Sequence, residues 1–243
     1  MDSNRKYMSR ADADVAQYDV GLRQYMLGVY NHMVSALVFT GIVAYATTVL
    51  AVQDGAMTGF GQAIYASPLK WVVMLAPLGM VFLLSARIRS MSLGSARISF
   101  YVFAALMGLS LSSIFLVFTG ESVVRVFFIT AAAFGGLSLY GYTTKKDLSG
   151  FGSFLIMGLF GIIIASIVNI FLASSALQFA ISVIGVLVFA GLTAYDTQRI
   201  KEMYNEIDAS DIAGKKAIMG ALSLYLNFIN MFMLLLQLFG NRE

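Results

Sequence analysis

The sequence predicts an all-α membrane protein, a bundle of seven transmembrane helices with a cytoplasmic amino terminus. Charged residues make up 12% of the 243 residues, whereas a soluble domain carries about 25%. Hydrophobic residues make up 59%, and the mean hydropathy is +0.80. The hydrophobic residues gather in seven runs, and seven spans of about 20 residues would fill most of such a chain. We therefore expect no separate soluble domain.

The chain begins with a polar stretch, and the apolar runs follow it in order. Residues 1–31 are rich in charges and lack the apolar core of a signal peptide, which predicts a cytoplasmic tail. A single transmembrane domain, residues 32–243, would follow, and its first span would direct insertion. The seven predicted spans are 33–52, 71–87, 98–119, 123–142, 154–173, 179–199 and 218–239.

Short links and the distribution of cations set the direction of the spans. The links 119–122 and 174–178 are so short that the spans on either side of each must run antiparallel. With the amino terminus inside, thirteen of the sixteen Lys and Arg residues lie on the cytoplasmic side, and only Lys70, Arg125 and Arg242 lie outside. An excess of cations in cytoplasmic loops is the usual rule. The carboxyl terminus is therefore expected outside.

The composition excludes several classes of function. Without cysteine the chain has no disulfide, thiolate nucleophile or zinc-thiolate site. The single histidine, His32, excludes a metalloprotease helix with two histidine ligands. A net charge of +3 spread over loops fits membrane orientation better than nucleic-acid binding. We expect no enzymatic activity, no cofactor and no nucleic-acid partner; the lipid bilayer is the expected surrounding.

One acidic residue, Asp196, lies within a predicted span. An ionised Asp at the centre of a spanning helix costs about 3 kcal/mol, so such a residue faces the bundle interior and has a partner. Asp196 is thus a candidate ion-binding or gating residue. The alternative is an interfacial pair with Arg199, three residues further along the same helix.

The last span carries a stripe of polar residues. Ser223, Asn227, Asn230 and Gln237 share one face of the helix, and apolar residues occupy the others. Such a stripe turns inward, either as a pore lining or as hydrogen-bonding contacts between helices. Arg87, near the cytoplasmic end of span two, reaches the same layer as Asp196 and Asn227. It is a candidate partner, unless it extends to lipid phosphates together with Arg89.

Three segments resemble those of a known family. They read AYDTQRIK at 194–201, ALSLYLNFIN at 221–230 and LSLYGYTTKKDL at 137–148. From about Gly21 onward the chain resembles the bacterial branch of the Bax inhibitor-1, or transmembrane Bax inhibitor motif, family. The resemblance implies a seven-helix bundle with a central last helix in a bacterial inner membrane, acting as a pH-sensitive calcium leak channel.

The resemblance also assigns roles to residues. In the family two aspartates, one in each of the last two spans, form a hydrogen-bonded pair, and a span-two arginine latches the closed state. The first aspartate corresponds to Asp196 and the arginine to Arg87, with Arg89 as the alternative. At the second aspartate this chain has Asn227. Two adjacent carboxylates share a proton, whereas an amide does not titrate, so we expect a weaker response to pH.

Two functions from different classes remain open. The first is a calcium-permeable leak, in which oxygen atoms of Asp196 and Asn227 bind calcium and Ser223, Asn230 and Gln237 line the pore. The second is a non-conducting regulator that binds other membrane proteins such as a membrane protease, a role that the bacterial relatives suggest. Calcium conductance would distinguish the two.

Overall fold

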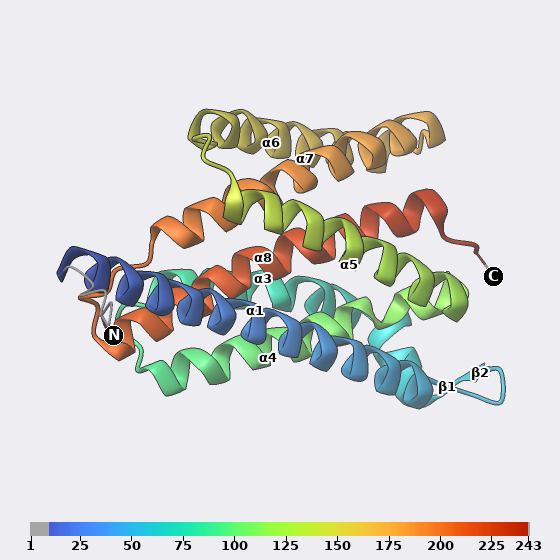
Figure 1. The fold of residues 1–243 in the computed structure, drawn as a ribbon. Coiled ribbons are helices and arrows are strands. Elements are labelled where there is room, and N and C mark those ends of the chain that lie inside the picture. Colours follow the sequence, from blue (N-terminus) through green and yellow to red (C-terminus); the bar gives the residue numbers. More distant parts are fainter. Residues whose placement is uncertain (1–9, 243) are drawn as a thin grey trace, which may run out of the picture.

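The computed structural model describes residues 10–242, with side chains from Tyr18 onward, and confirms the predicted seven-helix bundle. Residues 1–9 of the predicted tail lie outside the described residues. Seven helices are long and apolar enough to cross a membrane (Figure 1). They are α1 (Arg10–Ala51), α3 (Leu69–Arg87), α4 (Leu93–Leu111), α5 (Gly120–Thr143), α6 (Ser149–Leu172), α7 (Ser175–Glu202) and α8 (Ser210–Phe239).

The first helix begins much earlier than the predicted start at residue 33. α1 is already helical at Arg10, and Leu22, Met26 and Val29 are buried against the bundle. Their spacing places them on one face of a helix, and the neighbouring Asp19 and Arg23 are exposed. An amphipathic segment of this kind extends the spanning helix beyond the membrane, so the expected boundary between residues 31 and 32 does not interrupt the helix.

The connection between α1 and α3 is structured. Strands β1 (Val52–Gln53) and β2 (Ala56–Met57) pair as a hairpin, followed by the short helix α2 (Gly59–Gly61) and a π-helical turn, η1 (Gln62–Ala66). The two turn residues, Asp54 and Gly55, have φ angles of 52° and 74°. An Asp-Gly pair adopts such positive φ angles readily, which is why it closes two-residue hairpins.

Helix α8 lies at the centre of the bundle. It packs against α1, α4, α5 and α7, whereas α6 packs mainly against α7 at the edge (Figure 1). Tyr225 of α8 is completely buried: its ring meets that of Phe103 at 5.1 Å, and its hydroxyl group lies 2.7 Å from that of Thr40. The central last helix implied by the resemblance is therefore confirmed.

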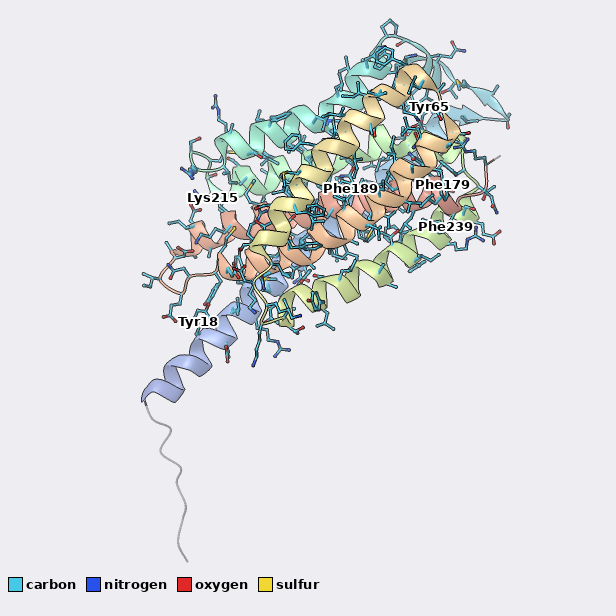
Figure 2. The ribbon with its side chains drawn as sticks, turned by 90° about the horizontal axis from the view of Figure 1, so that it is seen from above. Tyr18, Tyr65, Phe179, Phe189, Lys215 and Phe239 are labelled. Carbon is cyan, nitrogen blue, oxygen red and sulfur yellow. The ribbon has the colours of Figure 1, made fainter. Side chains whose placement is uncertain are left out.

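The bundle has two distinct ends, which Figure 2 shows by the labelled Tyr18 and Lys215 at one end and Phe179 and Phe239 at the other. At the first end the α3–α4 loop is tied to α8, since the Lys215 ammonium donates to the Met91 carbonyl at 3.1 Å. At the second end a 3₁₀ turn, η2 (Ser112–Leu116), follows α4, and Phe118 pairs with Arg242. The first and last described residues lie at opposite ends.

Candidate functional site

Asp196 of α7 faces the central helix and is 7% exposed. Its Oδ1 lies 2.8 Å from Nη2 of Arg199, and its Oδ2 accepts a hydrogen bond of 2.8 Å from Nδ2 of Asn227. Both carboxylate oxygens thus have a strong donor, one charged and one neutral. Such pairing is what allows a carboxylate to remain buried within a membrane helix.

Arg199 closes this cluster on its more exposed side. Its side chain is 45% exposed, and the same Nη2 that binds Asp196 donates to Oγ of Ser223 at 3.2 Å. The guanidinium group also lies over the ring of Tyr195, 5.7 Å from its centroid. Arg199 therefore links the buried carboxylate of α7 to the polar face of α8.

Helical spacing brings these side chains together. Asp196 and Arg199 stand three residues apart on α7, and Ser223 and Asn227 stand four apart on α8, so each pair shares one face of its helix. Because α7 and α8 pack against each other, the two faces meet. The structure thus joins Asp196, Asn227 and Ser223 of the predicted site.

Arg87 is not part of this cluster. It is exposed at the end of α3, a helix that packs against α4, and among residues 18–242 it has no acidic side-chain partner within ion-pair distance. Arg89 lies in the following turn and is likewise exposed. The predicted contact of Asp196 with a span-two arginine is therefore replaced by the intrahelical pair with Arg199. An arginine three residues away reaches the carboxylate without any approach between helices.

The other polar residues of α8 do not form one continuous stripe. Asn230 is exposed and donates to the Leu226 carbonyl of its own helix at 2.8 Å. Gln237, near the other end of the bundle, accepts from Gln178 at 2.6 Å and from Ser182 at 3.1 Å. Gln237 therefore forms hydrogen bonds between helices, which was the alternative to a pore lining. Asn230 lies outside the Asp196 cluster.

A chain of hydroxyl groups reaches the residue beside Asp196. The hydroxyl groups of Tyr30 on α1 and Ser138 on α5 lie 2.6 Å apart, and that of Ser138 lies 3.0 Å from the hydroxyl group of Thr197 on α7. No pattern in the sequence predicted this chain of hydroxyl groups. Its sequence signals were Ser138 and Thr197, polar residues near the ends of two apolar spans.

The site offers few ligands to a metal ion. The described residues contain no group of three or more His, Asp or Glu side chains able to hold one. Calcium takes six to eight oxygen ligands, and here Asp196 and Asn227 would supply side-chain oxygens. The Asp196 carboxylate is already engaged by Arg199 and Asn227, so a cation could bind it fully only after Arg199 moves aside.

Comparisons with known proteins agree with this architecture. Residues 22–243 match the family model described as "Inhibitor of apoptosis-promoting Bax1". An uncharacterized protein of Caulobacter vibrioides is 49% identical, over 100% of this chain and 99% of the relative. The inner membrane protein YbhL of Escherichia coli K12 is 47% identical, over 96% and 98%. Together with the seven spans, this places the chain in the bacterial inner membrane as a multi-pass protein. The chain belongs to the Bax inhibitor family.

Proposed function

We propose that this protein is a calcium-permeable leak of the inner membrane and that the Asp196 cluster holds its closed state. The observation that carries the proposal is the buried carboxylate of Asp196, with Arg199 on one oxygen and Asn227 on the other. A carboxylate facing the central helix attracts cations, and a mobile arginine competes with them for it.

Arg199 is suited to act as the movable partner. Its side chain is nearly half exposed and stands on the same helix as Asp196, so a change of rotamer can release the carboxylate without displacing α7. Calcium would then replace the guanidinium as the counter-charge, with ligands from Asp196, Asn227, backbone carbonyls and water. Because Asn227 does not titrate, the flux should depend only weakly on pH between about 6 and 8.

Calcium flux from purified protein tests the proposal directly. We expect calcium flux into liposomes that contain the protein and a calcium dye. Asp196→Asn should change the basal rate of this flux and abolish any response of the flux to calcium. The carboxamide of the variant is neutral, so it lacks both the attraction of the carboxylate for cations and its ion pair with Arg199. Absence of flux at every pH would overturn the leak and favour a regulator that binds other membrane proteins.

A matched pair of arginine variants identifies the closing residue. Arg199→Gln removes the charge beside Asp196 and should raise basal flux about fivefold or more, the range of a typical coupling between two states. Arg87→Gln removes an exposed charge from the end of α3 and should leave flux unchanged. If Arg87→Gln raised basal flux and Arg199→Gln did not, Arg87 would be the residue that holds the closed state, as the resemblance implies.

A further inference from the structure

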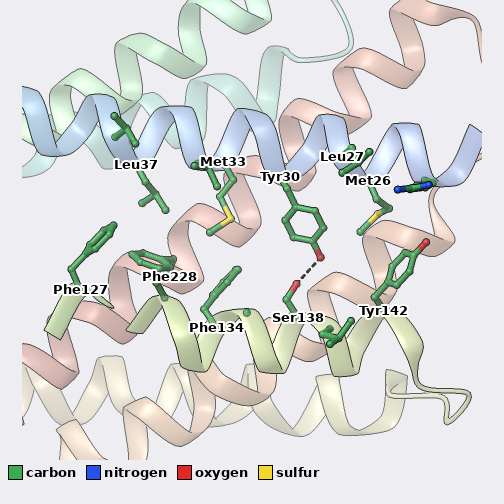
Figure 3. A pocket seen from close by; sticks show the side chains of 16 residues that line it. Met26, Leu27, Tyr30, Met33, Leu37, Phe127, Phe134, Ser138, Tyr142 and Phe228 are labelled. Carbon is green, nitrogen blue, oxygen red and sulfur yellow. Dashed lines mark hydrogen bonds between the residues drawn. The ribbon is translucent and has the colours of Figure 1, made fainter. Parts of the chain in front are cut away.

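A cavity of about 740 Å³ lies between α1 and α5, and none of its lining residues belongs to the Asp196 cluster (Figure 3). Its walls come from membrane-spanning helices, with Phe228 of α8 contributing between them. Its volume falls within the range of sites for small organic ligands, about 300–1,000 Å³. The apolar residues labelled in Figure 3 include Met26, Met33, Leu37, Phe127 and Phe134.

The middle of the cavity presents no free polar side chain. The hydroxyl groups of Tyr30 and Ser138 lie there, 2.6 Å apart, and form a hydrogen bond with each other (Figure 3). Since this pair is satisfied internally, the wall is suited to a hydrocarbon chain and offers little to a polar solute.

One end of the cavity is basic. Arg23 contributes to the lining one turn before Leu27, and it is exposed. Among the side chains that the structure describes, no acidic group lies within ion-pair distance of Arg23. Tyr142 lines the same end (Figure 3). The exposed Lys145, Lys146 and Asp147 follow it in the α5–α6 loop and together carry a net charge of +1. This end attracts an anion, whereas the other end is formed by Leu37, Val38 and Phe127.

The length of the cavity matches one leaflet of a bilayer. The lining residues of α1 run from Arg23 to Val38, a rise of about 22 Å along a helix. Half of a hydrocarbon core about 30 Å thick is about 15 Å, which leaves room for a headgroup at the Arg23 end. An acyl chain lying in the cavity would therefore place its phosphate beside Arg23.

We propose that this cavity binds one anionic phospholipid from the leaflet on the Arg23 side. Its acyl chain lies along α1 and α5, and its phosphate group binds Arg23, with Lys145 and Lys146 adding to the positive field. The net negative charge of the headgroup distinguishes this lipid from a zwitterionic one, since basic residues next to the membrane favour anionic lipids. The proposal does not rest on calcium conduction, because the lining includes none of the residues of the Asp196 cluster.

Quenching of a single tryptophan by brominated lipid tests the site. In a Trp71→Phe background, Leu139→Trp places the reporter in the cavity wall, and Phe160→Trp places a control on α6, where Phe160 is 62% exposed. The vesicles contain phosphatidylcholine and a rising fraction of brominated phosphatidylglycerol. We expect half-maximal quenching of the cavity reporter at about a fivefold lower fraction than that of the control, the factor that one basic residue near an anionic surface supplies.

Two matched pairs of substitutions locate the lipid. Gly135 lines the cavity and Gly136 does not, and an added Cβ would meet no atom within 4 Å at either. Gly135→Leu should abolish the preference of the cavity reporter for phosphatidylglycerol, whereas Gly136→Leu should retain it. Arg23→Gln should also abolish it, and Arg97→Gln, which removes an exposed charge outside the cavity, should not.

Three results would overturn the proposal. Identical quenching curves for the two reporters would mean that the cavity has no lipid preference. If the preference for phosphatidylglycerol survived Arg23→Gln, Arg23 would not be the residue that binds the headgroup. A cavity reporter that brominated phosphatidylglycerol does not quench at any fraction would show that protein, such as a second copy of this chain, covers the opening.

Discussion

The cation that neutralises Asp196 comes from its own helix. A pair three residues apart on one helix needs no contribution from another helix. The cost of inserting the carboxylate, about 3 kcal/mol for an unpaired Asp, is thereby reduced within α7 itself. Asn227 then satisfies the second oxygen when α8 docks. The sequence predicted the buried acid and offered this pair as the alternative, but both the depth of Arg87 in span two and the resemblance favoured Arg87 as the partner.

The residue at position 227 should set the pH dependence of the site. Asn227→Asp would place a second carboxylate within hydrogen-bonding distance of Asp196, where the amide nitrogen now lies 2.8 Å from Oδ2. Two such carboxylates share a proton, and one apparent pKa of the pair rises. We expect a steep change of calcium flux between about pH 6 and 8 in this variant and a shallow one in the natural protein.

A neighbouring amide provides the control for that substitution. Asn230→Asp adds the same charge to α8 at an exposed position whose side chain bonds only its own helix. Its pH profile should follow that of the natural protein. A natural profile that is already steep, and that Asn227→Asp leaves unchanged, would contradict this account of the site.

At the scale of helices, small residues allow α5 and α7 to approach closely. A Cβ atom added at Gly141 would lie 2.2 Å from the carbonyl oxygen of Ala194. Small residues at helix crossings are how membrane helices gain close packing. The crossing lies within one turn of Ser138 and Thr197, whose hydroxyl groups bond across the same interface, so the glycine also keeps this hydrogen bond short.

Substitution at this crossing should destabilise the bundle. Gly141→Val forces two backbones apart, and overpacking of this kind costs about 1–3 kcal/mol. For a chain of this size each kcal/mol lowers the midpoint of thermal unfolding by about 2–4 °C. Gly136→Val, on the same helix with open space around its Cβ position, should have little effect in the same detergent. Equal midpoints for the two variants would show that the crossing tolerates a side chain.

The helices themselves could be predicted because hydropathy and length decide which segments enter a bilayer. The long extension of α1 was missed, since its residues are too polar to count as a span although Leu22 and Met26 are buried. Contacts between helices were harder to predict. They depend on how each helix is rotated about its axis, which is why Asn230 could be assigned to the Asp196 face of α8 and yet point elsewhere.

For the molecule as a whole, charge is distributed unevenly between the two ends of the bundle. The end with the α3–α4, α5–α6 and α7–α8 connections carries Arg87, Lys145, Lys201 and other cations, whereas Lys70, Arg125 and Arg242 belong to the opposite end. At the first end several cations bind backbone carbonyls, as Lys201 does at Tyr142 with a distance of 2.9 Å. The positive charge of this end and its folded loops would both oppose its transfer across the membrane.

We therefore expect the cation-rich end to face the cytoplasm, as the rule of positive charge inside requires. Reporter fusions after Lys146 and Asn205, in the α5–α6 and α7–α8 connections, should report the cytoplasm. Fusions after Thr119, at the start of α5, and at the carboxyl terminus should report the periplasm, because an odd number of spans separates the two ends of the chain. A cytoplasmic carboxyl terminus would mean that one of the seven helices does not cross the membrane. A wholly inverted pattern would instead mean that loop charge does not set the orientation, and the phospholipid at Arg23 would then come from the outer leaflet.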